Sequence, residues 1–400
     1  MSADLEASRA IESLRAGVPG SAAVARLGTT QDEIARSFSG SLSALEQNIG
    51  SAPISITANF GDGKSHLLHC LKSDAERRGF VTSMVVVSPE MPMGNAHIVL
   101  KAIAEEAVAP GHTGKALMEL AANSPFDALP VIRRWADNAP ILDRFRALLT
   151  VYESTTDEEL RMEILSDLEG NPVSVAKIRQ ALKEIQGASH FDLRAPRNAL
   201  LAHDRIRLLG KFCQAHGTKG LVVFFDEVER IAQFPFKARL SAYQEIGWWN
   251  SLCLEPDSGV FAVFALTTRG IDQCLTEKGD ESRIKSSTTL LEVDERDRFA
   301  VEGIGLLKRA DSNRLVGATP EQFERMQHGV RALYEAAYGI MPQVLPKNPL
   351  SITIRSEIRR WITIWDLKRH YPDYVANVSV QDVKLNSDEF DGAELALAEE

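Results

Sequence analysis

The chain has 400 residues, of which 44% are hydrophobic and 25% charged, a composition typical of a globular protein with two or three structural units. This excludes a disordered or fibrous chain, and no apolar run approaches the roughly 20 residues that cross a bilayer; without a secretory signal pattern, we expect a cytoplasmic protein. The net charge of −10 excludes a general attraction to nucleic acid, so any contact with DNA is expected to be local.

Residues 1–50 predict an N-terminal segment of short helices. Glycines at 17, 20 and 28 interrupt the helical pattern. The series Phe38, Leu42, Leu45 and Ile49 has helical spacing and ends the segment. We expect these helices to lead into the unit that follows.

An α/β core is predicted for residues 51–295. The β-branched run at 54–57 predicts a strand, the apolar periodicity of His66 to Arg78 predicts a helix, and Phe80 to Ser88 predicts a second strand. Continuous apolar runs of this kind are typical of a parallel sheet that helices cover on both faces.

The rest of the chain predicts a helical insertion, a return to the sheet and a helical lid. From about 95 to 216 the pattern is helical and broken by prolines. Further strands are expected at Leu221–Phe225, Val260–Leu266 and, closing the sheet, Thr288–Val293. Helical patterns then predict a lid over 296–386, followed by an acidic tail over 387–400 that we expect to be solvated.

The segment from Ala58 to Ser65 fits the phosphate-binding P-loop (Walker A) pattern, except that Ala58 replaces its first glycine. Glycines let the backbone point its N–H groups at phosphate, and the following helix adds its positive end. Lys64 would bridge the β and γ phosphates of ATP, and Ser65 would ligate Mg²⁺. The alternative is an ordinary glycine turn, but the strand before and the helix after favour the P-loop. The expected ATP-binding residues are Ala58, Asn59, Phe60, Gly61, Asp62, Gly63, Lys64, Ser65 and His66.

Two further strand ends carry candidate catalytic residues. Asp226 and Glu227 follow the strand Leu221–Phe225; Asp226 would hold Mg²⁺ through water, and Glu227 would polarise the attacking water as general base. Alternatively, Asp226 only caps the next helix. Thr268, after the strand ending at Leu266, could reach the γ phosphate and the water, or its hydroxyl could simply bond to the backbone of a turn.

The order of these elements resembles the AAA+ class of P-loop ATPases, particularly its origin-recognition-like branch. The resemblance implies that Arg283, ahead of the last strand, reaches the site of a neighbouring copy in an oligomer; the alternative is a surface arginine that pairs with Asp280 or Glu281. It also implies a lid arginine that senses the nucleotide. Arg355 matches that position, and Arg359, one turn later on the same face, is the second choice.

A closer resemblance covers most of the chain, to the ATP-binding proteins of BREX-type bacterial phage-defence loci. It is carried by the segments Arg9–Pro19, Phe60–Leu68 and Val87–Glu90. The resemblance implies a defence ATPase that acts beside a helicase or a DNA-modifying partner. The P-loop of that family usually begins with glycine, so Ala58 bears on the rate of hydrolysis more than on nucleotide binding.

Two main hypotheses for the function follow. The first is an ATPase that uses ATP and Mg²⁺ and whose lid closure drives or licenses a partner acting on DNA. The second is a slow or non-hydrolysing switch that binds ATP and presents its helical insertion to partner proteins or DNA. Direct DNA binding is a third possibility, because basic residues lie near Trp361, Trp365 and Tyr371, although the tryptophans could instead pack the lid core.

Overall fold

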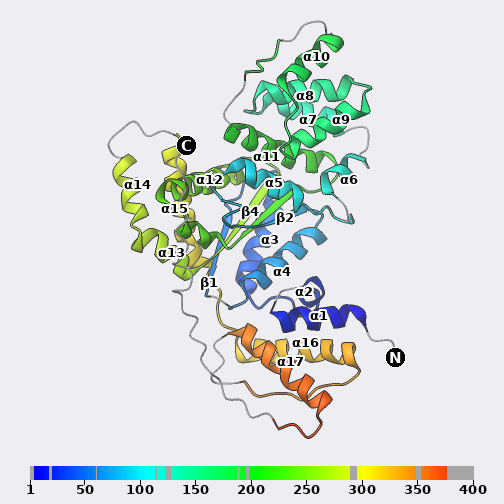
Figure 1. Cartoon of the computed structure of the whole chain (residues 1–400), viewed down its shortest axis with the longest axis vertical. Coiled ribbons are helices and arrows are strands. Elements are labelled where there is room, and N and C mark those ends of the chain that lie inside the picture. The colour runs from blue at the N-terminus through cyan, green and yellow to red at the C-terminus, as the bar shows by residue number, and fades with distance from the viewer. Residues whose placement is uncertain are drawn as a thin grey trace.

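The computed structural model describes residues 4–17, 20–59, 61–112, 115–122, 128–186, 190–194, 198–288, 295–347 and 353–375. These residues form three bodies arranged along the long axis of the molecule (Figure 1). A central sheet lies between a bundle of helices at one end and a small lid, which contains both early and late helices of the chain, at the other.

The central sheet has four parallel strands in the order β1-β4-β3-β2. The strands are β1 (Ile54–Ala58), β2 (Val81–Val86), β3 (Leu221–Asp226) and β4 (Val260–Thr267). In this register Ala58 lies opposite Thr267, and Asp226 lies opposite Val86. The α/β class and the parallel sheet predicted from the apolar runs are therefore confirmed, and the polar residues that follow β1, β3 and β4 share one edge.

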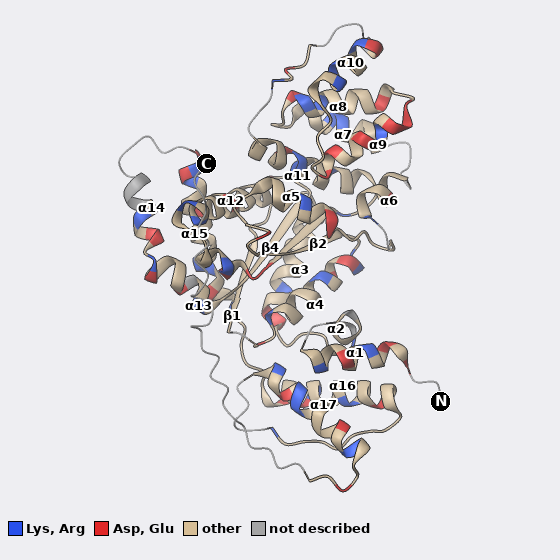
Figure 2. Cartoon of the chain, in the orientation of Figure 1, with Lys and Arg blue, Asp and Glu red and all other residues tan. Residues whose placement is uncertain are grey.

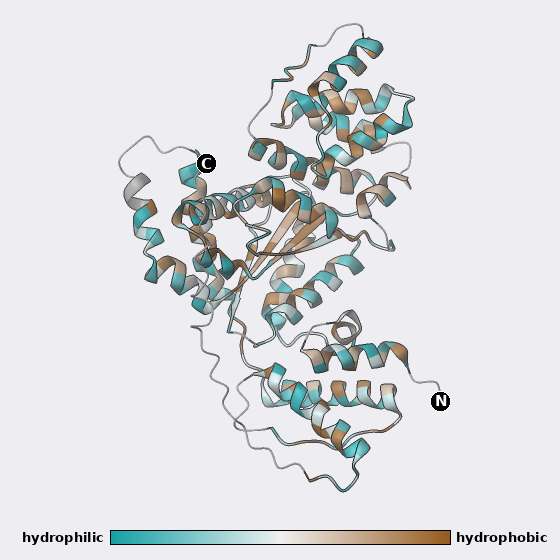
Figure 3. Ribbon diagram, in the orientation of Figure 1, coloured by the Kyte–Doolittle hydropathy of each residue, from teal (hydrophilic) through white to brown (hydrophobic). Residues whose placement is uncertain are grey.

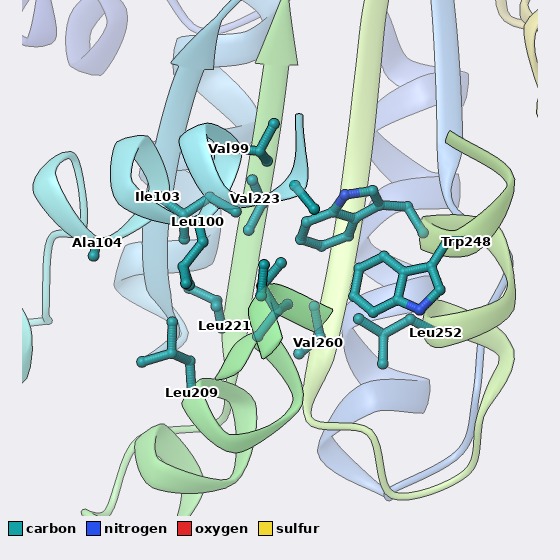
Figure 4. Close-up of a cluster of buried hydrophobic side chains, with 14 of the residues drawn as sticks. Val99, Leu100, Ile103, Ala104, Leu209, Leu221, Val223, Trp248, Leu252 and Val260 are labelled. Carbon is teal, nitrogen blue, oxygen red and sulfur yellow. The ribbon is translucent and has the colours of Figure 1, made fainter. Parts of the chain in front are cut away.

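Helices cover both faces of the sheet, which explains why the strands are apolar on both sides. One face packs against α3 (Asp32–Glu46) and α4 (Lys64–Arg77), and the other against α5 (Ala96–Glu105), α11 (Asn198–Ala215), α12 (Phe236–Leu254) and α15 (Glu295–Arg309). Figure 4 shows the second face, where Leu100, Val223 and Trp248 come together from α5, β3 and α12. The strands are accordingly the most hydrophobic ribbons in Figure 3.

The end bundle consists of the helices between α5 and α11. They are α6 (Ala116–Ala122), α7 (Ala128–Asn138), α8 (Asp143–Ser154), α9 (Glu158–Leu168) and α10 (Val175–Gln186). Among the described residues of this stretch there is no strand, only a single bridge from Val108 to Thr82. The buried carboxylate of Asp167 in α9 accepts hydrogen bonds from Arg144 of α8 and Arg205 of α11, at 2.6 and 2.8 Å, and so joins the bundle to α11.

The lid combines the two ends of the described chain. It consists of α1 (Leu5–Ala16), α2 (Ser21–Leu27), α16 (Pro320–Tyr338) and α17 (Ile354–His370), packed around the fully buried Trp361 and Tyr334. The N-terminal segment predicted over 1–50 is thus divided, since α1 and α2 pack in the lid and α3 packs on the sheet. Helical periodicity reveals an apolar face but not the partner of that face.

The closing strand predicted at Thr288–Val293 is contradicted at its first residue only. Thr288 ends the helix α14 (Asp280–Thr288), and residues 289–294 lie outside the described part of the chain. The position beside β1 is instead taken after α15, where Arg314 forms a parallel bridge to Thr57 and the Leu315 N–H donates to the Thr57 carbonyl at 2.9 Å. The acidic tail at 387–400 also lies outside the described residues.

The remaining short elements connect the sheet to these helices. They are the 3-10 turn η1 (Val228–Gln233), α13 (Thr268–Asp272), the π-helical turn η2 (Gln273–Glu277) and the 3-10 turn η3 (Ala310–Asn313). Helix α15 packs along α12 and contacts β1, so the chain from 295 to 309 belongs with the sheet, and the lid helices resume only at Pro320.

Candidate nucleotide-binding site

The loop between β1 and α4 is a tight turn closed by its own residues. The Asn59 N–H donates to the carboxylate of Asp62 at 3.2 Å, and the Asp62 N–H donates to the Asn59 carbonyl at 3.3 Å. Gly61 and Gly63 have φ values of +87° and +97°, which residues with a side chain rarely adopt. The N-terminus of α4 therefore opens directly onto the turn, as an anion-binding loop requires. Phe60 lies outside the described residues.

Ala58, the departure from the P-loop pattern, is the last residue of β1. It is fully buried and pairs with Thr267 in the sheet, and the residues with positive φ do not include it. An extended backbone is accessible to any residue, so this position does not need the freedom of glycine. The curvature of the loop comes from Gly61 and Gly63, both of which are retained.

Lys64, Ser65 and Asp226 come together at the carboxyl ends of β1 and β3. The Ser65 hydroxyl donates to Asp226 Oδ2 at 2.9 Å, and the amine of Lys64 contacts Asp226 Oδ1. Asp226 also accepts a bond from the Glu227 N–H at 2.8 Å. Because its carboxylate contacts both Lys64 and Ser65, Asp226 does more than cap the following turn. A hydroxyl beside a carboxylate is a donor set that suits Mg²⁺.

Glu227, the expected general base, has an unusual backbone and an engaged side chain. Its φ of +57° lies in the left-handed region, which is costly for a residue with a β-carbon. Its carboxylate is 2.5 Å from Nε of Arg230, and the side chain is 37% exposed. Although Glu227 directly follows Asp226 in the chain, its carboxylate forms an ion pair with Arg230.

Glu229, which the sequence reasoning missed, faces the P-loop lysine. Its Oε1 lies 4.0 Å from Nζ of Lys64, and its side chain is 20% exposed. Burial raises the pKa of Glu229, and the nearby Asp226 adds to this effect, while Lys64 opposes it. The signal in the sequence was the second glutamate of Asp-Glu-Val-Glu, but the direction of its side chain depends on the 3-10 turn η1.

The two threonines at the end of β4 have different hydrogen-bond partners. Thr267 accepts a bond from the Gly270 N–H at 3.3 Å and caps α13. The hydroxyl of Thr268 lies 3.2 Å from that of Thr57, the residue before Ala58. The hydroxyl bonded to the backbone of the turn is thus that of Thr267, and Thr268 lies next to the strand that leads into the P-loop.

His66 binds the N-terminal segment. Its Nε2 lies 2.7 Å from the Gly28 carbonyl, and the Cys70 thiol donates to the same oxygen at 3.2 Å. Burial lowers the pKa of His66, which favours the neutral ring as the donor to this carbonyl. The imidazole expected at the phosphates therefore holds the α2–α3 connection against α4.

A cavity of about 220 Å³ lies between the P-loop and the lid. From the lid side, Thr353 approaches the loop closely, since a β-carbon on Gly61 would lie 3.0 Å from Cγ2 of Thr353. Arg355 lines the cavity, whereas Arg359 is exposed and is not part of its wall. The wall includes Gly28, Thr29, Thr30, Gln31, Gly61, Gly63, Gln322 and Arg325. A nucleotide whose phosphates lie on the P-loop could place its base and ribose here.

Arg283 lies on α14 and is exposed, with its guanidinium carbon 3.7 Å from the ring centroid of Phe236. The two acids considered as its partners also contact basic or polar residues of neighbouring helices. Asp280 is fully buried and accepts bonds from Arg239 at 2.6 Å and from Tyr243 at 2.8 Å, and Glu281 pairs with Lys308 at 3.0 Å. The N-terminus of α14 is thereby attached to α12.

The basic and aromatic cluster of α17 packs the lid. Trp361 and Trp365 are 0% and 2% exposed, so their rings are not available to stack on bases. Arg360 pairs with Glu357 at 2.8 Å, and Arg369 lies over the ring of Tyr338 at 3.8 Å. Acidic and basic residues are interspersed over α16 and α17 in Figure 2. Of the two roles considered for the tryptophans, packing of the lid core and stacking on bases, the structure supports the first.

Comparison with known protein families finds a match over most of the chain. A protein-family model described as BREX system ATP-binding protein BrxC/D matches residues 4–120 and 141–360. These ranges include the P-loop, the strand that ends in Asp226, and Arg355. No curated protein matches the chain. None of the helices that the structure describes combines the length and the apolarity needed to cross a bilayer.

Proposed function

Since the chain belongs to the family of BREX system ATP-binding proteins BrxC/D, we propose that it is a phage-defence ATPase that couples ATP hydrolysis to a DNA-acting partner. The observation that carries this proposal is the meeting of Lys64, Ser65 and Asp226 at one edge of the parallel sheet. An amine, a hydroxyl and a carboxylate at the N-terminus of a helix are the groups that bind a nucleoside triphosphate with its metal.

Each of these groups has a definite role in the proposed reaction. The N–H groups of the loop and Lys64 hold the phosphates, and the hydroxyl of Ser65 and the carboxylate of Asp226 hold Mg²⁺. The metal, when bound, would neutralise charge on the β and γ phosphates. Among the catalytic residues predicted from the sequence, Glu227 would polarise the attacking water, and Thr268 would orient it from the end of β4.

We further propose that the fold is of the AAA+ class, in which the lid and a neighbouring copy complete the site. The proposal is supported by the strand order and by the position of Arg355 in the wall of the cavity. Arg355 would reach the γ phosphate from the lid, with Arg359 as the less favoured choice because it is exposed. Arg283 would act in the site of the next copy.

Phosphate release from ATP tests the enzymatic part of this proposal. The wild-type protein should release phosphate in the presence of Mg²⁺, and Lys64→Ala and Asp226→Asn should each lower the rate by roughly 100-fold or more, because charge stabilisation of the transition state is lost. A rate that is the same in all three proteins would contradict the assigned site.

A nucleotide-dependent switch is the second candidate, and the contact of Thr353 with the P-loop favours it. Because Thr353, the N-cap of α17, lies against Gly61, phosphate binding would alter the lid even without turnover. Wild type and Glu227→Gln distinguish the two candidates. If both bind ATP and consume it equally slowly, the protein acts as a switch.

Assembly tests the role of Arg283. Light scattering should detect oligomers that form with ATP in the wild type and are absent in Lys64→Ala. If the protein remains a monomer with ATP, with ADP and without nucleotide, Arg283 has no site of a neighbour to enter.

A further inference from the structure

Gly17, at the end of α1, lies against the side chain of Arg355. A β-carbon placed on Gly17 would lie 3.3 Å from Cδ, 3.5 Å from Cγ and 3.7 Å from Nε of Arg355. The shortest of these distances is tighter than an ordinary van der Waals contact, so the stem of the arginine passes through space that is open because residue 17 has no side chain. Both residues line the cavity between the P-loop and the lid.

The backbone of Gly17 does not by itself explain this contact. Its φ is +75°, and its N–H donates to the Leu14 carbonyl at 3.1 Å and ends α1. Gly339 ends α16 with nearly the same geometry, at a φ of +72°, but a β-carbon on Gly339 would meet no atom within 4 Å. Both glycines adopt the left-handed conformation that other residues avoid. Of these two helix ends in the lid, that of α1 is the one that contacts the arginine.

The end of α1 is held in place on α17, the helix that carries Arg355. Arg15, two residues before Gly17, donates to Oδ2 of Asp366 from Nε at 3.1 Å and from Nη2 at 2.9 Å. The hydroxyl of Tyr334 in α16 donates to Oδ1 of the same carboxylate at 2.9 Å. Because Asp366 and Arg355 lie on one helix, these bonds fix the backbone at Gly17 relative to the arginine.

We propose that Gly17 is a positioning residue for Arg355: the exposed backbone at the end of α1 supports the arginine stem, so that its guanidinium is presented to the γ phosphate. This inference rests on the lid arginine proposed above. A long side chain that is already held in place loses less conformational entropy when it binds a ligand. Since ADP has no γ phosphate, the contact of Gly17 with Arg355 increases the preference of the protein for ATP over ADP.

The test compares Gly17→Ala with Gly339→Ala, which places the same residue in the same backbone conformation away from the arginine. Isothermal titration calorimetry with Mg²⁺ measures the affinities of the full chain for ADP and for a non-hydrolysable ATP analogue. Arg355→Ala should lower the ratio of the two affinities by roughly tenfold or more, because a bond from a charged group is lost. We expect a loss of about three- to tenfold in Gly17→Ala, from a misplaced guanidinium, and an unchanged ratio in Gly339→Ala.

A double-mutant cycle separates positioning from a structural role. In the Arg355→Ala background, Gly17→Ala should not change the ratio further, because the side chain through which Gly17 acts is gone. Loss of stability alone does not distinguish the two nucleotides, and urea unfolding should show similar losses in Gly17→Ala and Gly339→Ala. If Gly17→Ala does not fold, Gly17→Asn and Gly339→Asn replace the pair, since asparagine tolerates the left-handed region and still carries a β-carbon.

The outcomes separate this inference from the proposals on which it rests. If Arg355→Ala lowers the ratio but Gly17→Ala behaves as Gly339→Ala, or acts equally with and without Arg355, the role of Gly17 is overturned and the lid arginine stands. If Arg355→Ala leaves the ratio unchanged, the lid arginine and the role of Gly17 fall together, and the P-loop site stands. A wild type that binds neither nucleotide contradicts the proposed function itself.

Discussion

The hydroxyl of Ser65 lies 2.9 Å from the carboxylate of Asp226, across a separation of 161 residues in the chain. The contact joins the first turn of α4, which follows β1, to the carboxyl end of β3. Since β4 lies between β1 and β3 in the sheet, the contact passes over the end of β4. Because both residues are held by regular elements, the proposed metal and phosphate site is preorganised.

Lys64→Ala should weaken ATP binding by about ten- to a hundredfold, because a hydrogen bond from a charged group is worth about 1.5–3 kcal/mol. Isothermal titration calorimetry measures the affinity. Lys72→Ala is the matched control, since Lys72 lies on the same helix and pairs with Glu76. Equal losses in the two variants would contradict a specific role of Lys64.

Ala58→Gly should not improve nucleotide binding, although it restores the usual P-loop pattern. Ala58 is a buried strand residue without a left-handed backbone, and glycine in a strand costs about 0.5–1 kcal/mol. We expect unchanged ATP affinity and a lower free energy of unfolding in urea. A large rise in affinity or turnover would show that the β-carbon of Ala58 does restrict the loop.

Gly61→Ala should impair both stability and ATP binding. A left-handed backbone costs a residue with a β-carbon about 1–2 kcal/mol, and the added carbon would also press on Thr353. Gly79→Ala is the control, because Gly79 has a φ of +90° and ample room, at the end of α4 remote from the loop. Both variants should lose stability, as measured by urea unfolding, but only Gly61→Ala should lose affinity for ATP.

Stability should fall as the pH drops through about 6.5, partly because of His66. Burial lowers the pKa of His66 in the folded protein below the value of 6.5 for a free side chain. The unfolded chain then binds the proton more readily, so the contribution to stability is complete above pH 6.5 and is lost as the pH falls below it. Urea unfolding at several pH values measures the change.

His66→Gln should reduce this pH dependence, because the amide can still donate to the Gly28 carbonyl but does not titrate. The fall will not vanish, since burial also lowers the pKa of His216. An unaltered slope in His66→Gln would contradict the role given to His66.

The strands and the core of the site could be predicted from the sequence because their signals are local. Runs such as Leu221–Phe225 are apolar on both faces, and the P-loop carries its glycines at fixed offsets. The meeting of Lys64 with Asp226 then follows from the parallel sheet, which brings the ends of its strands to one edge.

Other features depend on tertiary contacts that no local pattern contains. The packing of α1 in the lid arises from contacts with α16, more than three hundred residues later in the chain. The direction of Glu229 depends on the 3-10 geometry of η1 and on the small size of Gly270. The bridge of Arg314 to Thr57 involves too few residues to show the alternation of a strand.

The division of the N-terminal segment means that the chain passes between the lid and the sheet twice. One crossing is the α2–α3 connection and the other follows Leu315, and the side chain of Gln31 joins them through bonds to both the carbonyl and the N–H of Val316, at 2.9 and 3.1 Å. We infer that the two crossings form one hinge, so that the lid rotates about a single axis relative to the sheet. Distances between spin labels on α17 and α4, measured with and without ATP, should change along one coordinate, and Gln31→Ala should broaden their distribution. Since Gln31 also lines the cavity, a nucleotide bound there would act on the lid at the axis of its proposed movement.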